Sequence, residues 1–279
     1  MQVTPLTNAL GAVVEGVDVR DPGDDFAAVH AALLEHEVIF FPGVHLTEDE
    51  HMALGRRFGT PSIFPVSRHL GATEPVLTTI VDHPGQANAA DHWHTDVTWI
   101  AEPPKIALLT AVDIPERGGD TLWASGTAAY EALTPKFQDW LAGMTVVHSV
   151  EGFLMGVRKK LGDDGDDLVD ALRRGYPPVE HPLVRTHPET GRRALMYSSE
   201  FMTRVVGVSD DESRAVLDFV GSWIKDVRFH VRWHWSPGDL AIWDERSTAH
   251  RAAGDHFPHA RSIRRLEIDG DRPFFDPTR

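Results

Sequence analysis

The chain has no cysteine among its 279 residues. Disulfides, thiolate nucleophiles and thiolate metal sites are therefore excluded, and a transition metal would have to be held by histidine and carboxylate side chains. Positive charge is also scarce, with 27 lysines and arginines against 42 acidic residues and a formal net charge of −15. Nucleic acids and anionic membranes both require a cationic protein surface, so we expect neither as a partner.

Long apolar segments are missing as well. No run approaches the roughly 20 residues that a membrane helix requires. The N-terminal segment MQVTPLTNALGAVVEGVDV lacks the basic stretch and apolar run of a signal peptide. We find no repeat and no linker, and 42% hydrophobic residues allow a sizeable core. The expectation is a single cytoplasmic domain over residues 1–279.

Short strands and turns dominate the local patterns. Capping-box patterns at residues 47–50 and 209–212 each predict the start of a helix, and apolar spacing predicts another over 24–37. Strands are expected at 11–19, 38–41, 106–114, 121–123, 182–185, 194–197, 229–235 and 240–243, with hairpin turns at 187–191 and 236–239. These patterns predict a mainly β fold with flanking helices, closed or sandwiched.

Residues 151–178 differ from their surroundings. Glycine, aspartate, lysine and arginine are mixed there around a weak helical pattern. We predict that this segment is a mobile lid, with a partly helical surface insertion as the simpler alternative.

The segment 91–99, DHWHTDVTW, contains the strongest candidate metal ligands. A His-x-acid pair alone is weak evidence, because about two such pairs are expected by chance from 16 histidines and 42 acids in 279 residues, and two occur. His187 and Glu189 lie in an expected turn. His94 and Asp96 lie in a β-branched and aromatic run typical of a strand, where residues two apart face the same side.

Strand geometry leaves the ligand set open. His92 shares a face with Asp96 as His94 does, although a surface or pocket-rim role is the simpler interpretation for it. A second histidine from elsewhere would complete the 2-His-1-carboxylate set that suits Fe(II) with open coordination positions. The other histidines in strand-like runs are most simply partly buried polar residues: His148, His230 and His234.

Four blocks of sequence resemble a known family. They are WHTDVTW (93–99), GGDTLWASGTAAYEAL (118–133), HPLVRTHPETGRRAL (181–195) and AIWDERSTAHRA (241–252). In this order they are similar to the taurine dioxygenase (TauD/TfdA) family of Fe(II)- and 2-oxoglutarate-dependent dioxygenases. The resemblance implies a double-stranded β-helix, a jelly-roll variant. It also implies an enzyme that uses O2 and 2-oxoglutarate to hydroxylate a C–H bond, releasing succinate and CO2, and relatives that are commonly dimers or tetramers.

The resemblance also implies roles for individual residues. The family's iron ligands match His94, Asp96 and His250, its 2-oxoglutarate residues match Thr121 and Arg261, and its substrate-anion arginine matches Arg265. Halogenating relatives lack the carboxylate that Asp96 provides, so its presence favours hydroxylation. A spacing of four residues keeps the two arginines on one face of a strand.

A charge count supports an anionic substrate. Fe(II), Asp96 and 2-oxoglutarate together carry one net negative charge, which Arg261 neutralises by pairing with the distal carboxylate. Arg265 would then leave a surplus positive charge beside the iron. Because an uncompensated buried cation is costly, we expect an organic anion to be bound there.

Substrate-contacting positions differ from those of the taurine-cleaving member. Polar groups are lost and apolar bulk is gained at several matching positions, while one aromatic residue is retained. We therefore expect taurine to be disfavoured against an anion on a hydrophobic body, such as an alkyl sulfate, sulfonate or carboxylate. The candidate substrate residues are Phe64, Ser67, Ala90, Phe153, Leu154, the retained Phe201, and His92 at the rim of the substrate mouth.

Other functions stay open. The same iron centre could serve a tailoring oxygenase that hydroxylates or desaturates a specialised metabolite. A non-enzymatic β-helix module or a Zn(II) hydrolase could retain the same ligands, but Thr121 and Arg261 would then have no purpose.

Overall fold

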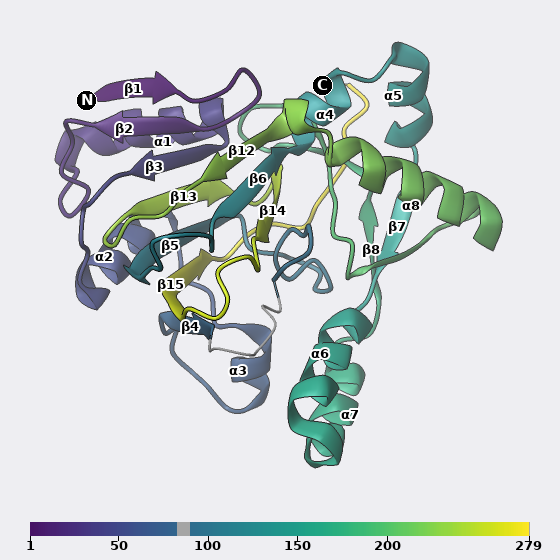
Figure 1. Cartoon of the computed structure of the whole chain (residues 1–279). Helices are drawn as coiled ribbons and strands as arrows, with labels where there is room; N and C mark the ends of the chain where they lie inside the picture. The colour runs from purple at the N-terminus through teal and green to yellow at the C-terminus, as the bar shows by residue number, and fades with distance from the viewer. Residues whose placement is uncertain (83–89, 279) are drawn as a thin grey trace.

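The computed structural model describes residues 1–82 and 90–278, and two facing sheets form its centre (Figure 1). The larger sheet has seven strands, in the spatial order β1 (Gln2–Pro5), β2 (Ala12–Glu15), β3 (Val38–Phe41), β13 (Leu240–Asp244), β5 (Ile106–Asp113), β15 (Arg261–Ile268) and β4 (Thr78–Asp82). The smaller sheet has the order β12 (His230–Trp233), β6 (Thr121–Ser125) and β14 (Thr248–Ala252).

Two minor sheets lie beside this centre. One has the order β11 (Met202–Val205), β7 (Thr145–His148) and β8 (Val179–Pro182), and the other pairs β10 (Arg193–Leu195) with β9 (Val184–Thr186). All of these pairings are antiparallel except that of β2 with β3. The architecture is mainly β with flanking helices, as the sequence predicts.

Aromatic side chains fill the space between the two central sheets. Trp123 of β6 is fully buried and points at Phe40 of β3 and Trp243 of β13, with ring centroids 5.3 and 5.6 Å apart. Burial of such large apolar groups contributes strongly to stability. This layer fixes the spacing between β6 and β15, whose inner faces carry candidate co-substrate residues.

Helices cover the outer face of the large sheet (Figure 1). Buried side chains of α1 (Phe26–His36) and α2 (Glu48–Phe58) pack against those of β3, β5 and β13. Thr47 caps α2 in a complete capping box with Glu50, and Ser209 does the same with Glu212 at α8 (Asp210–Ile224). Both capping predictions are confirmed, and in each case an orphan N–H group of the first turn gains a partner.

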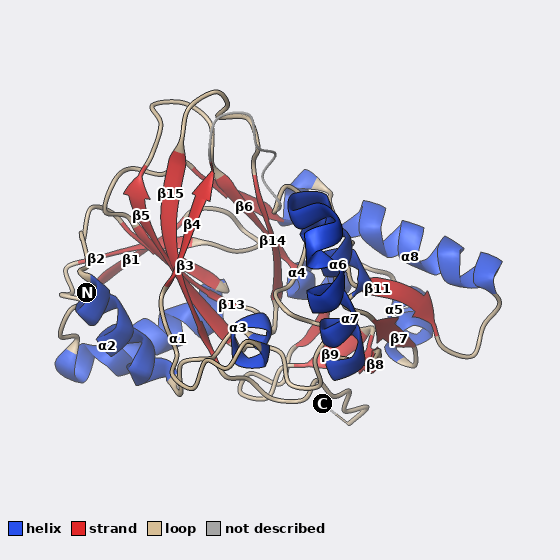
Figure 2. Cartoon of the chain, turned by 90° about the horizontal axis from the view of Figure 1, so that it is seen from below, coloured by secondary structure: helices blue, strands red, loops and turns tan. Residues whose placement is uncertain are grey.

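Five further helices belong to the described structure. They are α3 (Pro65–His69), α4 (Gly126–Glu131), α5 (Pro135–Ala142), α6 (Glu151–Leu161) and α7 (Asp166–Gly175), with 3-10 turns at Gly23–Asp25, Gly162–Gly165 and Val227–Phe229. The segment predicted as a lid is a pair of helices, α6 and α7, lying side by side at the edge of the molecule (Figures 1 and 2). Its mobility stays a prediction. Within the described ranges, no helix is long and apolar enough to cross a membrane.

Three local predictions are wrong. Residues 91–99 form no strand, because only His94 makes an isolated bridge, with His250, before a turn. Residues 182–185 are divided between β8 and β9, which belong to different sheets. The turn at 236–239 joins β12 to β13, again in different sheets, so it is no hairpin, whereas the hairpin at 187–191 is confirmed between β9 and β10. Pairing with distant segments decides each case, and a local pattern does not report it.

Candidate metal centre and active site

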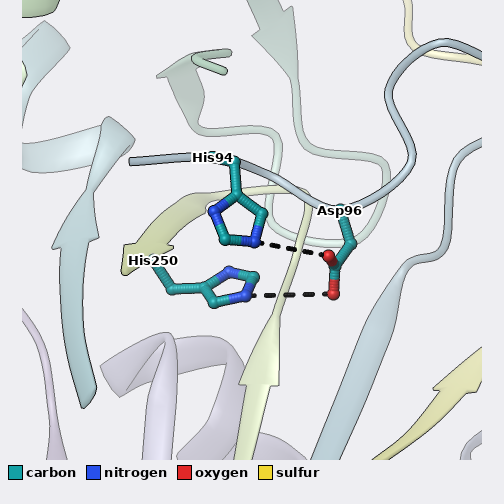
Figure 3. A group of neighbouring side chains, drawn as sticks. All are labelled: His94, Asp96 and His250. Atoms are coloured by element: carbon teal, nitrogen blue, oxygen red, sulfur yellow. Dashed lines mark ion pairs between the residues drawn. The ribbon is translucent and has the colours of Figure 1, made fainter. Parts of the chain in front are cut away.

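A reciprocal pair of backbone hydrogen bonds brings two distant histidines together. His94 N–H donates to the His250 carbonyl at 2.9 Å, and His250 N–H donates back at 2.7 Å. The imidazole centroids are consequently 4.2 Å apart. Asp96 faces both rings, with Oδ1 3.6 Å from His94 Nε2 and Oδ2 3.9 Å from His250 Nε2 (Figure 3). All three candidate ligand atoms lie within 4.8 Å of one another and are buried.

A tight turn, and not strand alternation, aims Asp96 at the histidines. Thr95 Oγ1 donates to the Thr248 carbonyl at 2.8 Å, and Asp96 N–H donates to Glu245 Oε2 at 3.1 Å. Val97 then adopts φ +53°, a rare conformation for a β-branched residue. Such strain persists only where surrounding contacts over-determine the backbone, and it often occurs at functional sites.

The two imidazoles are held neutral, as metal ligands must be. His94 Nδ1 lies 2.8 Å from the His92 carbonyl and donates to it, which leaves the Nε2 lone pair facing the site. Burial lowers the pKa of His94, and burial lowers the pKa of His250 well below its ordinary value. Burial alone would raise the pKa of Asp96, but the adjacent Arg265 guanidinium outweighs it, lowers the pKa and holds that carboxyl ionised.

These three side chains fit an Fe(II) ion. Two neutral imidazole nitrogens and one carboxylate converge from one side, the facial arrangement that leaves coordination positions open. Arg265 Nη1 lies 3.2 and 3.1 Å from the two Asp96 oxygens, so a cationic group already compensates the carboxylate. The carboxylate is thereby kept ionised, as a metal ligand must be.

The predicted co-substrate residues meet on the inner faces of β6 and β15. Arg261 Nη2 lies 3.3 Å from Thr121 Oγ1, which also accepts a hydrogen bond from Trp235 Nε1 at 3.0 Å. Arg261 is 1% exposed, and its Nε has no partner among the described residues. A buried guanidinium with a free donor fits a carboxylate ligand. The prediction that Arg261 and Arg265 share a strand face agrees with these contacts.

The backbone conformation explains why two glycines stand in the GGD block before Thr121. Both Gly118 and Gly119 have φ +73°, and Gly119 N–H donates to Asp255 Oδ1 at 2.9 Å. A Cβ at Gly119 would meet Arg261 Cδ at 2.9 Å. Glycine is required here because the backbone passes directly over the arginine side chain.

Sequence reasoning missed two buried acids beside the metal ligands. Glu267 Oε1 lies 3.5 Å from Arg265 Nη2, and burial, only partly opposed by Arg265, raises the pKa of Glu267 to about 7. Burial and the nearby Asp96 raise the pKa of Glu245 well above its ordinary value. The charge count made from the sequence left out Glu245 and Glu267 and was therefore incomplete. A signal was available for Glu267, which lies two residues after Arg265 and shares its strand face.

Aromatic side chains form a wall beside Arg265. The guanidinium lies 6.0 Å from the Phe64 ring centroid, Phe64 lies 6.0 Å from Phe153, and Phe153 lies 6.1 Å from Trp99. Leu154 and Phe201 are buried in the same apolar cluster, together with the inner side of α7. Four of the predicted substrate residues thus belong to one apolar group, and Trp99 is an addition that sequence reasoning missed.

Other predicted residues lie at the edges. His92 is partly exposed, and its Nε2 lies 2.8 Å from Glu200 Oε2, so the structure places it outside the three-residue cluster. Ser67 is partly buried on α3, and the Ala90 carbonyl accepts a hydrogen bond from Ala252. The remaining candidate histidines bond within the fold: His148 to Thr98, His230 to the Ile224 carbonyl and His234 to Asp120.

A facial His-Asp-His cluster between two β-sheets defines the class as a mononuclear non-haem iron oxygenase. The model of the taurine catabolism dioxygenase TauD, TfdA family matches residues 2–266, and the chain belongs to that family. It is thus an oxidoreductase that uses Fe(II), 2-oxoglutarate and O2, and the sequence resemblance is confirmed. The binding-module interpretation is thereby overturned.

Several curated relatives match nearly the whole chain. An alkylsulfatase of Acinetobacter baylyi (strain ATCC 33305 / BD413 / ADP1) is 33% identical over 97% of this chain and 86% of its own length. An alpha-ketoglutarate-dependent sulfate ester dioxygenase of Pseudomonas putida is 32% identical over 98% and 91%. A crystal structure of a taurine dioxygenase from Burkholderia xenovorans superposes with a TM-score of 0.81 at 34% identity, covering 100% of this chain and 94% of that one.

Proposed function

We propose that this enzyme hydroxylates a C–H bond of a small organic anion with an apolar body, releasing succinate and CO2. The observation that carries the proposal is the position of Arg265, between the Asp96 carboxylate and the Phe64 ring. An anion bound by this guanidinium would have its apolar body against the Phe64, Phe153 and Trp99 rings. Hydrophobic contact there would hold a carbon of the substrate beside the metal centre.

Roles for the other residues follow from their positions. His94, Asp96 and His250 would hold Fe(II), and Thr121 with Arg261 would bind the distal carboxylate of 2-oxoglutarate. When bound, Fe(II) with 2-oxoglutarate and O2 supplies the oxidising chemistry, giving one oxygen atom to succinate and one to the substrate. The protein residues orient the C–H bond and exclude water, and the apolar wall serves both purposes.

Among anions, we favour an alkyl sulfate. Two relatives are named an alkylsulfatase and a sulfate ester dioxygenase, while a third, from Delftia acidovorans, is named (S)-phenoxypropionate/alpha-ketoglutarate-dioxygenase. Hydroxylation at the carbon that bears the sulfate oxygen would give a hemiacetal-like product, which expels sulfate as an aldehyde forms. The aromatic wall also suits an aryl carboxylate, so the substrate test must include both classes.

Larger features of the proposal concern the fold. The two central sheets would form a double-stranded β-helix in a single domain over residues 1–279, with α6 and α7 as a mobile lid. We also propose a cytoplasmic location, as expected from the sequence, and assembly into a dimer or tetramer on family resemblance.

The test is succinate release in air by the Fe(II)-loaded enzyme with 2-oxoglutarate. Hexyl sulfate, hexanesulfonate, hexanoate, a phenoxy carboxylate and taurine form a set that varies the anion and the body separately. We expect sulfate release and aldehyde formation from hexyl sulfate and little turnover of taurine. Turnover confined to taurine would contradict the proposal.

A further inference from the structure

Arg261 has a buried acidic neighbour that the proposed reaction does not use. Asp82 ends β4 and is the register partner of Arg261 on β15. Its Oδ2 lies 3.5 Å from Arg261 Nη1, and the two residues are 8% and 1% exposed. The other end of the guanidinium, Nη2, faces Thr121 Oγ1 at 3.3 Å. One arginine is therefore placed between a resident carboxylate and the proposed site for the co-substrate carboxylate.

His256 completes this buried cluster. Its Nε2 lies 3.6 Å from Asp82 Oδ2, and the residue is 1% exposed. Among the described residues, Asp82 Oδ2, Arg261 Nε and both ring nitrogens of His256 lack a hydrogen-bond partner. Asp82 therefore holds Arg261 by charge at a distance longer than a good hydrogen bond, and donors of the guanidinium stay available.

A buried guanidinium without a counter-ion is strongly unfavourable. Before 2-oxoglutarate binds, Asp82 is the acid paired with Arg261 in the described structure. After binding, two carboxylates would lie against one guanidinium, and they would repel each other in a poorly hydrated space.

We propose that Asp82 is the resident counter-ion of Arg261, which keeps the co-substrate site assembled when empty and competes with the distal carboxylate of 2-oxoglutarate. Asp82 is thus a positioning residue that lowers co-substrate affinity while it stabilises the free enzyme. This inference rests on the proposed role of Arg261 in binding 2-oxoglutarate.

The test replaces Asp82 by asparagine, which keeps the shape and a hydrogen-bond acceptor but removes the charge. Binding of N-oxalylglycine, a non-reacting analogue of 2-oxoglutarate, to the Mn(II)-loaded protein is measured by calorimetry, and thermal unfolding is followed in the ligand-free protein. We expect Asp82→Asn to lower the Tm of the ligand-free protein and to tighten N-oxalylglycine binding by about threefold to tenfold. A purely structural role would lower the Tm without tightening the ligand. If the asparagine variant does not fold, Asp82→Ser provides the same comparison.

The matched control is Asp271→Asn. Asp271 lies 3.4 Å from the buried Arg185, which belongs to a different sheet, so this variant also removes the counter-ion of a buried arginine. It should lower the Tm but leave the Kd of N-oxalylglycine unchanged. A second control ligand is 2-oxopentanoate, which has the carbon chain of 2-oxoglutarate without the distal carboxylate. Asp82→Asn should not tighten the binding of 2-oxopentanoate.

The outcomes separate the two proposals. If Arg261→Gln leaves N-oxalylglycine affinity unchanged, the proposed role of Arg261 fails. If Arg261→Gln abolishes binding while the Asp82 variants bind equally or more weakly than the parent, only the counter-ion role fails. Equal tightening by Asp271→Asn would also overturn it, because the effect would then not depend on the neighbour of Arg261.

Discussion

Arg265 lies with its Nη1 3.1 Å from Oδ2 of Asp96, so the proposed substrate anchor and a proposed metal ligand form an ion pair. The guanidinium is thus oriented by Asp96 before any substrate arrives. Preorganisation of this kind reduces the entropy lost on binding. An anion bound by Arg265, and with it the adjacent carbon, would lie close to the proposed metal site.

Replacement of Arg265 should separate substrate binding from metal binding. We expect Arg265→Ala to raise the KM for an anionic substrate by at least about 100-fold, the scale of a lost charge-assisted pair. Arg265→Lys should recover part of the loss, since it keeps the charge without the planar fork. Steady-state kinetics measure the effect, and Fe(II) content checks that the metal remains. An unchanged KM would contradict the anchor role.

The proposed metal ligands His94 and Asp96 can be distinguished from His92, which lies on the same segment. We expect His94→Ala and Asp96→Ala to lose stoichiometric Fe(II), because each would remove one of three ligands. His92→Ala is the matched control, since His92 is also an imidazole but pairs with Glu200 at the rim. It should bind Fe(II) normally under anaerobic conditions. Loss of metal in the His92 variant would show that the ligand set is wrong.

At position 97, glycine should give a more stable protein than alanine, which reverses the usual order of stability. The φ of +53° at Val97 penalises every residue with a Cβ, whereas glycine adopts it freely. Although both variants lose the branched side chain, Val97→Gly should be more stable than Val97→Ala by about 1 kcal/mol. Denaturant unfolding measures the difference. If alanine proves the more stable, the turn is not strained.

Gly119 should be intolerant of any side chain. A Cβ there would meet Arg261 Cδ at 2.9 Å, so Gly119→Ala should displace the arginine and raise the KM for 2-oxoglutarate by about tenfold. Gly143→Ala is a suitable control, because its Cβ would have open space and its φ is negative. Succinate release at varied 2-oxoglutarate measures both. If the two substitutions changed the KM for 2-oxoglutarate equally, a specific effect of a side chain at position 119 on Arg261 would be excluded.

Two buried histidines should make stability fall on mild acidification. Burial lowers the pKa of His148 to about 3 and that of His181 to about 4, against about 6.5 in the unfolded chain. The unfolded state therefore takes up protons first as the pH falls. The stability from these groups is complete above about pH 6.5 and is lost progressively down to about pH 3.

Denaturant unfolding between about pH 7 and pH 5 would measure this slope. His148→Gln should flatten it, since the remaining amide can still bond to Thr98 Oγ1, which lies 2.9 Å from His148 Nδ1 in the parent. A variant with an unchanged slope would show that His148 does not contribute.

Much of this protein could be predicted from its sequence. The two capping boxes, the β-rich core and the absence of thiolate chemistry depend on local pattern or composition alone. The site residues followed from long motif blocks, and the structure brings His94, Asp96 and His250 together as that resemblance implies. Strand alternation supplied the wrong reason for the same pair, because a strained turn aims Asp96 at the histidines.

Only the tertiary structure decided which distant groups share the site. His250 is recruited by a backbone bridge to His94 across more than half of the chain. Glu245, Glu267 and Asp82 become parts of the charge balance only because three separate strand ends bring them beside Asp96 and the two arginines. Local sequence determines secondary structure and ligand type, but burial and distance set the charge and the pKa of each group. Those quantities arise only when the sheets pack.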